Sequence, residues 1–570
     1  MFKNFFKLTS VASFYDKKKF YLVILSSFII ISLELFSIVA FIPLFQILIS
    51  KDLPHFFPTF FKELSYEIIL YSSLIFILSV FILKNLLIFL LEWFIISYQE
   101  IIRKSLSSDI FNYFTFENWL INVDVNSTTK IRHIDGEVKN FSNLIYLLIK
   151  FLNETVISFF LIIVLAIINF KILFFSFSVL LVFGSIYFFL IRRKFIQLNL
   201  KRYNLNLGFL SILQDTFRSL KDIKVLQKEL KFQNKFDKLN ESYKNVIIKV
   251  NIFSILPRFL LEPLIVLILV ITVFVLHNSN FNDNDILITL SLFSVVLFRL
   301  FPATNKIITN LQILTGGIPI INIVFNDFER AKSSQIKESK FKSNKLSFEK
   351  KIEVRNLNFK YKVKNKENLL TNINLEIKKG HSIGIFGPSG SGKSTLINII
   401  LGLIQQDSGE IFVDGKKVDN FDPAWKKLIG YVPQDINLIN DSLKNNITLN
   451  LDEKFDKEKM QEAIKVSKLN DFVNKLPNGL NTDLGEFGNK ISGGQKQRIG
   501  IARAIYREPS IIVLDESTNS LDTNLEQEII HSITEIKKNY SSIIISHRET
   551  TINRCDYIYE LNKEGIKQII

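Results

Sequence analysis

Long apolar stretches dominate the first 320 residues of the chain. Each is long enough for the roughly 20 residues that an α-helix needs to cross a bilayer. They lie at about 20–48, 66–98, 140–168, 171–191, 246–276 and 285–314. Several are longer than a bilayer requires, which predicts helices that continue into water on one side. The pattern therefore predicts an α-helical membrane domain with six transmembrane helices.

The pattern changes near residue 331. From Ala331 to Lys351 the chain is rich in Lys and Ser and loses its hydrophobicity, which is typical of a linker. Short apolar runs of strand and helix type follow to Ile570. We expect a membrane domain with long intracellular extensions at 1–330, a linker at 331–351 and a soluble α/β domain at 352–570.

Lys and Arg are distributed unevenly among the connections between the apolar stretches. The connections at 99–139 and 192–245 carry many of them, whereas those at 169–171 and 277–285 are very short, and the latter has acidic but no basic residues. Because basic loops stay on the cytoplasmic side, we expect both termini and the soluble domain in the cytoplasm, and the helices in the inner (plasma) membrane.

Two segments flank the first apolar stretch. Residues 1–19 are aromatic and basic and end in Lys17-Lys18-Lys19, which favours contact with the inner leaflet. Residues 51–65 (KDLPHFFPTFFKELS) are rich in Phe and polar residues. They are predicted to form either a short helix at the outer interface or an ordered loop.

Composition adds three constraints. The chain is 48% hydrophobic with a net charge of +16, but Lys, Asn, Ile and Phe are all heavily used, as in a biased genome, so the charge does not indicate nucleic acid. The single cysteine, Cys555, excludes an internal disulfide. The first apolar stretch is longer than a signal peptide's core and no small-residue cleavage site follows it, so we expect a retained anchor.

One motif between a strand pattern and a helix pattern indicates nucleotide chemistry. Residues 387–395 read GPSGSGKST, which fits the phosphate-binding pattern G-x-x-x-x-G-K-[ST]. Its glycines let the backbone curve around a polyphosphate with the N–H groups directed inward. The residues predicted to hold ATP are Gly387, Pro388, Ser389, Gly390, Ser391, Gly392, Lys393, Ser394 and Thr395. Lys393 suits the β- and γ-phosphates, and the Ser394 hydroxyl suits Mg²⁺.

A second nucleotide motif follows downstream. Residues 511–514 are four apolar residues of a buried-strand type, and Asp515 and Glu516 follow them. Asp515 is expected to bind Mg²⁺ directly or through water, and Glu516 suits a general base that polarises the attacking water. For residues 387–395 the alternative is a glycine-rich turn before a helix, which the spacing with both Lys393 and Ser394 in place disfavours. For the domain the alternative is an inactive relic, which is disfavoured because every residue needed for phosphoryl transfer is present.

Between these motifs stands ISGGQ at 491–495, and with it the segment resembles the nucleotide-binding domain of ABC transporters. The resemblance implies further residue roles. It implies that Tyr361 stacks on adenine, that Gln434 touches Mg²⁺ and water, and that His547 contacts the γ-phosphate. Asp522 matches a loop that crosses the dimer, although Ser520 replaces the family's usual Ala. The segment that contains Glu486 resembles a loop that contacts the intracellular helices in exporters.

The resemblance also implies how the protein assembles. In this family the signature loop, here Ser492, Gly493, Gly494 and Gln495, completes the nucleotide site of the opposite subunit. Each chain has one copy of every motif. Two chains are therefore expected to meet head to tail around two ATP molecules as a homodimer. Segments 118–129 and 214–220 are implied to couple the two domains.

Charged residues inside the apolar stretches bear on the cargo, because they are costly there unless paired or used. Six stand out: Glu34, Lys84, Glu92, Arg258, Glu262 and Arg299. The surroundings of Arg258 and Arg299 resemble bacterial ABC flippases for lipid-linked oligosaccharides. That resemblance implies that Lys84, Arg258 and Arg299 contact the diphosphate of a polyprenyl carrier. The alternative is that these cations pair with Glu34, Glu92 and Glu262 and only fix helix packing.

The sequence therefore predicts an ABC exporter half-transporter that uses ATP and Mg²⁺, contacts membrane lipids and flips an amphiphilic anionic substrate. An exporter of lipid A, a drug or a peptide is the first alternative, although no peptidase fits before residue 20. A soluble chromosome-organising or DNA-repair ATPase is the second, and it would need coiled coils or zinc modules that the sequence lacks.

Overall fold

The computed structural model describes the chain except for residues 1, 51–64, 118, 121–124, 169, 278–282, 339–345, 362–368, 450–453, 486–487, 517–527, 529–539, 547 and 563. The chain divides into two compact units. The first comprises Met1–Glu117 and Val125–Ile336, and the second comprises Asn118–Asp124 and Lys337–Ile570. The short segment that contains Trp119 and Leu120 thus groups with the C-terminal unit, where Leu120 packs against a hydrophobic core.

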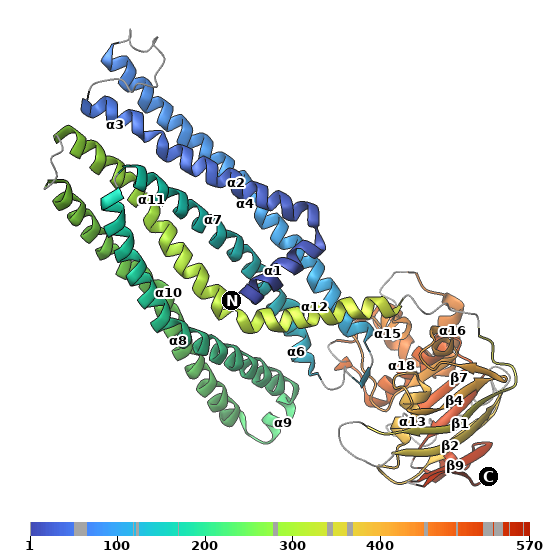
Figure 1. Cartoon of the computed structure of the whole chain (residues 1–570). Coiled ribbons are helices and arrows are strands. Elements are labelled where there is room, and N and C mark those ends of the chain that lie inside the picture. The colour runs from blue at the N-terminus through green and yellow to red at the C-terminus, as the bar shows by residue number, and fades with distance from the viewer. Residues whose placement is uncertain are drawn as a thin grey trace. The chain divides into compact units, whose positions relative to one another are not determined.

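The first unit is entirely helical in its described part (Figure 1). Its elements are α1 (Phe2–Tyr15), α2 (Lys17–Val39), α3 (Phe41–Ser50), α4 (Tyr66–Phe116), α6 (Ser127–Ile131), the π-helix η2 (Arg132–Glu137), α7 (Val138–Ile168), α8 (Phe170–Arg218), α9 (Leu220–Val225), α10 (Glu229–His277), α11 (Asp283–Gly316) and α12 (Ile318–Glu338). Five candidate membrane spans were found among the described residues: Lys17–Ile49, Tyr66–Phe116, Ser127–Ile167, Glu229–Phe274 and Ile286–Gly316.

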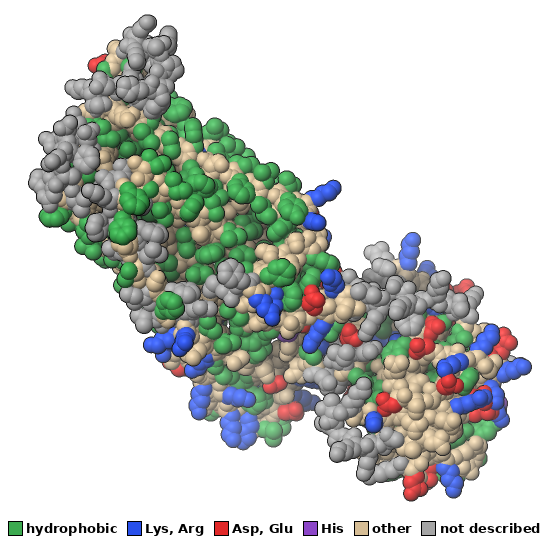
Figure 2. All heavy atoms as spheres, in the orientation of Figure 1, with side chains coloured by type: hydrophobic (Ala, Val, Ile, Leu, Met, Phe, Trp, Pro, Cys, Tyr) green, Lys and Arg blue, Asp and Glu red, His purple; other side chains and the backbone are tan. Residues whose placement is uncertain are grey.

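The remaining predicted span, 171–191, lies on α8. Many of its side chains fall outside the described residues, to which the five spans above refer. Figure 2 shows apolar side chains over much of the visible face of the helical unit. Phe89 and Phe298 are among the strongly exposed apolar residues of this unit. A helical surface of this kind fits contact with lipid rather than water.

Helix α4 shows how the long helices extend past the apolar stretches. It has 51 residues, so it is about 75 Å long, more than twice the hydrocarbon thickness. From the last turn of the apolar stretch at 66–98 onward, its buried residues recur every three or four positions, at Ile95, Tyr98, Ile102, Leu106, Ile110 and Tyr113. One face of α4 therefore remains buried against its neighbours beyond residue 98, where the other faces are no longer apolar.

The second unit has two β-sheets. The four-stranded sheet has the order β2-β1-β4-β5 and is antiparallel, with β1 Lys351–Phe359, β2 Leu370–Lys378, β4 Ser408–Val413 and β5 Lys416–Val418. The six-stranded sheet has the order β10-β9-β3-β8-β7-β6, with β3 Ser382–Phe386, β6 Ile429–Val432, β7 Ile511–Asp515, β8 Ser541–Ile545, β9 Tyr557–Asn562 and β10 Gly565–Gln568. All of its pairs except β9–β10 are parallel.

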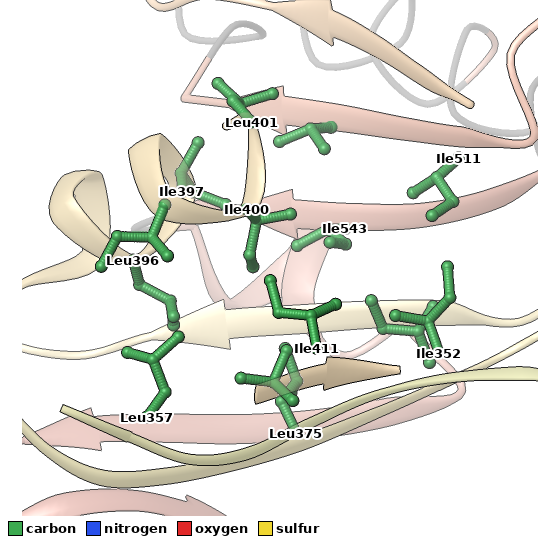
Figure 3. Packing of buried hydrophobic residues seen from close by; sticks show 14 of the residues in the cluster. Ile352, Leu357, Leu375, Leu396, Ile397, Ile400, Leu401, Ile411, Ile511 and Ile543 are labelled. Atoms are coloured by element: carbon green, nitrogen blue, oxygen red, sulfur yellow. The ribbon is translucent and has the colours of Figure 1, made fainter. Parts of the chain in front are cut away.

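Helices complete this unit. They are α13 (Lys393–Ile400), α14 (Pro423–Lys427), α15 (Leu443–Thr448), α16 (Lys457–Val466), α17 (Asn470–Lys475), η3 (Gly479–Asn481), α18 (Gly493–Tyr506) and α20 (Glu549–Ile552). Figure 3 shows one core, in which Leu396 and Ile400 of α13 lie among side chains of both sheets, such as Ile411 and Ile543. The fully buried apolar strands β3, β7 and β8 are typical of the centre of a parallel sheet.

Candidate nucleotide site and buried charges of the helical unit

The phosphate-binding motif forms the turn between β3 and α13. Gly392 is the N-cap of α13 and has a φ of +97°. Gly387 has a φ of +156°, and a Cβ on it would lie 2.1 Å from the carbonyl oxygen of Leu561. The backbone at both positions therefore requires glycine. Pro388, Ser389, Gly390 and Ser394 are exposed, so the outer side of the turn is open, whereas Thr395 is buried.

Lys393 and Ser391 are the buried polar residues of this turn. Lys393 is only 8% exposed, and its Nζ donates hydrogen bonds to the carbonyl oxygens of Gly387 at 2.8 Å and Pro388 at 3.0 Å. These bonds hold the Lys393 ammonium group against the backbone of the phosphate-binding loop. The buried Ser391 Oγ has no hydrogen-bond partner within the described residues. A phosphate oxygen in the loop would satisfy such a hydroxyl.

Asp515 ends β7, two strands away from β3 in the sheet. Burial and the neighbouring Glu516 raise the pKa of Asp515, while a hydrogen bond from Tyr431 and the charge of Lys393 act in the opposite direction. The Tyr431 hydroxyl lies 3.4 Å from Asp515 Oδ2. The parallel sheet thus brings the second nucleotide motif within electrostatic reach of the first, at the carboxyl ends of β7 and β3, which β8 separates.

Glu516 stands in an uncommon backbone conformation, with a φ of +46°. Its N–H donates to the Ile545 carbonyl oxygen at 3.0 Å, which holds this conformation. Its side chain accepts a hydrogen bond of 3.0 Å from Gln434 Nε2. Left-handed non-glycine residues are costly and concentrate at functional sites. The structure therefore brings together two of the three residues predicted to be catalytic.

Tyr361 lies beside Thr395, the last residue of the phosphate-binding motif. Its hydroxyl is 3.2 Å from Thr395 Oγ1, and its ring packs edge-on against Phe359 with centroids 4.9 Å apart. The ring is 38% exposed, so one part of it remains open to a planar ligand.

Ser492, Gly493, Gly494 and Gln495 form the start of α18. Ser492 Oγ accepts from the Gln495 N–H at 3.3 Å, and Gln495 Oε1 accepts from the Ser492 N–H at 2.8 Å, which is a complete capping box. Over the described ranges, no hydrogen bond or ion pair links these four residues to the phosphate loop of the same chain. Asp522, His547 and Glu486 lie outside the described residues.

The six charged residues singled out in the apolar stretches all form ion pairs. Glu34 on α2 accepts two hydrogen bonds from Arg299 on α11, at 3.2 Å from Nε and 3.1 Å from NH2. Glu34 also lies 3.4 Å from Lys84 Nζ on α4. The structure thus brings Lys84 and Arg299 together on one carboxylate. Arg258 instead pairs at 3.1 Å with Glu262, one turn away on α10, and both side chains are exposed.

These ion pairs differ in part from the alternative in which the three cations pair with Glu34, Glu92 and Glu262 and only fix helix packing. Glu92 pairs with Lys150 and not with any of the three predicted cations. Two further charged residues, Glu154 on α7 and Lys306 on α11, were not predicted from sequence. They form an ion pair at 2.8 Å, and Arg299 lies 3.5 Å from Glu154. Both residues stand inside predicted apolar stretches, so the rule that drew attention to the other charges applies to them as well.

Comparisons with known proteins identify the domain in the second unit and the fold. Residues 370–519 match the family model described as ABC transporter. The second unit contains an ABC transporter domain. The whole chain also has the fold of a solved bacterial Atm1-family ABC exporter with ATP bound, with a TM-score of 0.79 at 19% identity over 96% of this chain and 95% of that one.

Two curated relatives are similar over a shorter region. An export ATP-binding/permease protein of Rickettsia typhi is 40% identical over 213 residues, and the ATP-dependent lipid A-core flippase of Escherichia coli K12 is 40% identical over 208 residues. The similarity spans 37% of this chain and of the former relative, and 36% of this chain and of the latter.

The donor set of the ABC transporter domain fits Mg²⁺ and a nucleotide. Ser394, Asp515 and Gln434 offer a hydroxyl, a carboxylate and an amide oxygen, the hard ligands that Mg²⁺ prefers. The Gln434 amide nitrogen is engaged by Glu516, which leaves the amide oxygen for a cation. Mg²⁺ bound with ATP neutralises charge on the β- and γ-phosphates. The orphaned Ser391 hydroxyl and the glycine turn fit the phosphates themselves.

Proposed function

We propose that this chain is a half-transporter of an ATP-driven ABC exporter. Two copies would form a homodimer that flips a polyprenyl-diphosphate-linked oligosaccharide, or a similar lipid-linked glycan, across the inner membrane. The observation that carries the ATP-driven part is the contact between Gln434 and Glu516 at the edge of the parallel sheet, beside the phosphate loop. It joins a candidate base to a candidate water-positioning residue.

The proposed chemistry assigns each residue a task. Glu516 would accept a proton from the attacking water, and Gln434 would hold the Glu516 carboxylate in place. Lys393 would bind phosphate oxygens, and the helix dipole of α13 would favour their negative charge. His547 and Asp522 are proposed to act at the γ-phosphate and across the dimer because of their motif positions alone.

The homodimer is proposed because the signature residues 492–495 start a separate helix, α18, with its own capping box. Their exposed N-terminal turn is a suitable donor surface for a phosphate, which a second chain would supply. Segments 118–129 and 214–220 are proposed to couple the domains. Leu120 supports the first, since it packs on the core of the C-terminal unit.

The anionic lipid substrate is proposed from Lys84, Arg258 and Arg299. Three side chains of the cluster formed by Glu34, Lys84, Glu154, Arg299 and Lys306 are cationic and two are anionic, so the cluster carries an excess positive charge. An excess cation inside a membrane domain is expensive and fits an anionic ligand. The alternative is export of another amphiphile. Among lipid A, a drug and a peptide, the relative named as a lipid A-core flippase favours lipid A.

Reconstitution in liposomes tests the proposal. Lipid-linked sugars on one leaflet should be lost in an ATP-dependent manner with the wild type. The triple substitution Lys84→Ala, Arg258→Ala and Arg299→Ala should retain basal ATPase activity and lose this transport. ATPase stimulation by lipid A or peptides, without movement of any lipid-linked sugar, would favour the alternative. Unchanged sugar transport by the triple variant would reject the assigned substrate residues.

A further inference from the structure

Glu34 occupies the position that an anionic ligand would need. Its two carboxylate oxygens accept separate hydrogen bonds from Nε and NH2 of Arg299. A guanidinium group uses the same two-pronged geometry to bind phosphate. Lys84 Nζ donates to Glu34 Oε2 at 3.4 Å and to Ser37 Oγ at 3.2 Å. A phosphate could not take these donors while Glu34 holds them.

The cluster around Glu34 is largely buried. The side chains of Lys84 and Glu154 are 9% and 7% exposed, and those of Glu34 and Arg299 are 15% and 20% exposed. Lys306, at 56%, is the exposed member. A carboxylate in such surroundings interacts strongly with its partners, because little water screens them.

Several polar atoms near the cluster lack hydrogen bonds. Within the described residues, Ser158 Oγ and Asn305 Oδ1 are buried without a hydrogen-bond partner, and Glu154 Oε2 has only its 3.5 Å ion-pair contact with Arg299. Ser158 is one helical turn from Glu154 on α7, and Asn305 adjoins Lys306 on α11. Buried polar atoms are normally satisfied. Of these atoms only the Ser158 hydroxyl can donate a hydrogen bond, so it is the unused donor beside the excess positive charge of the cluster.

We propose that Glu34 is a resident counter-ion that sets the charge threshold for ligands of this site, an inference that rests on the proposed function. A tethered carboxylate competes at an effective concentration of about a millimolar or more. A headgroup with one negative charge only replaces the charge that Glu34 already supplies. A diphosphate brings additional charge to Lys84, Arg299 and Lys306, and it displaces Glu34. The site thereby rejects the abundant monoanionic lipids and accepts diphosphate lipids.

Calorimetric titration of the full-length protein in phosphatidylcholine nanodiscs tests this, with farnesyl diphosphate as the probe. Glu34→Gln keeps the shape of the side chain and removes the competing charge. It should lower the Kd for farnesyl diphosphate about tenfold or more, because close charge pairs are worth at least that much. Glu92→Gln is the matched control, because Glu92 pairs with Lys150 and Tyr146 instead, and it should leave the Kd unchanged.

Selectivity provides a second readout. Phosphatidylglycerol added to the nanodiscs should weaken farnesyl diphosphate binding to Glu34→Gln and leave the wild type unaffected. Inorganic pyrophosphate, titrated separately, shows whether the headgroup suffices without the chain. Glu34→Asp, which retains the charge on a shorter side chain, should give an intermediate Kd. If Glu34→Gln does not fold, as judged by gel filtration and thermal unfolding, the Kd of Glu34→Asp tests the counter-ion role in its place.

The outcomes separate this inference from the proposed function. Wild-type binding that Glu34→Gln and Glu34→Asp leave unchanged would overturn the counter-ion role and preserve the diphosphate-lipid substrate. The same holds if phosphatidylglycerol affects the wild type and Glu34→Gln equally. No binding of farnesyl diphosphate to any variant would overturn both.

Discussion

Replacing Gln434 tests whether the Glu516 carboxylate is positioned for catalysis. Gln434→Ala removes the 3.0 Å hydrogen bond to Glu516 Oε2 and leaves the Glu516 backbone anchored to Ile545. A hydrogen bond to a charged group is worth about 1.5–3 kcal/mol, and the lower end applies because Gln434 is exposed. If that energy orients the base in the transition state, kcat for ATP hydrolysis should fall about tenfold.

Two further substitutions sharpen this prediction. Gln434→Glu cannot donate the bond and adds a second carboxylate, whose repulsion is about 1 kcal/mol at 4 Å in water. Its kcat should therefore be lower than that of Gln434→Ala by about another fivefold. Glu516→Gln removes the proposed base and should lower kcat by about 100-fold or more.

Steady-state ATPase measurements on the full-length protein in nanodiscs give kcat and KM for each variant. We expect the order wild type, Gln434→Ala, Gln434→Glu and Glu516→Gln in decreasing kcat. Wild-type kcat in Gln434→Ala, or equal activity of the two Gln434 variants, would refute the reasoning that this contact positions the base.

Three other residues offer independent tests. Gly387→Ala would place a Cβ 2.1 Å from the Leu561 carbonyl oxygen, so we expect a lower melting temperature and loss of ATP binding, measured by thermal unfolding with and without nucleotide. Tyr361→Ala should raise the KM for ATP, with little change in kcat, because the ring is proposed to stack on adenine, away from the reacting phosphate. Asp414 accepts three backbone N–H bonds, which outweigh burial and lower its pKa. The stability from Asp414 is therefore present above the unfolded-state pKa near 3.8 and lost as pH falls below it. Asp414→Asn should lower the melting temperature at neutral pH and reduce its drop in acid.

The phosphate loop could be predicted from sequence because it depends on local chemistry. A strand, three glycines, a lysine and a helix start follow each other directly, and the structure has β3 and α13 at those places. The contact between Gln434 and Glu516 depends instead on the strand order β8-β7-β6, and 82 residues separate the two side chains. Only resemblance to a family connected them beforehand.

The charges of the helical unit show the same limit. The Arg258–Glu262 pair was foreseeable because one helical turn separates the residues. Glu34 is 50 positions from Lys84 and 265 from Arg299, so their meeting depends on how α2, α4 and α11 pack. Hydrophobic periodicity does not specify which helices are neighbours, and it left the partner of Glu92 wrongly assigned in the packing alternative.

Complementation between two inactive chains tests the central claim, which is that each ATP site is built from two copies. One chain carries Lys393→Ala in the phosphate loop, and the other carries Ser492→Arg in the signature; different affinity tags allow the mixed dimer to be purified. If the sites are shared, the mixed dimer has one site with both motifs intact. It should then hydrolyse ATP well above either variant homodimer. Activity no higher than that of the two homodimers, in a mixed dimer that is folded, would contradict the account.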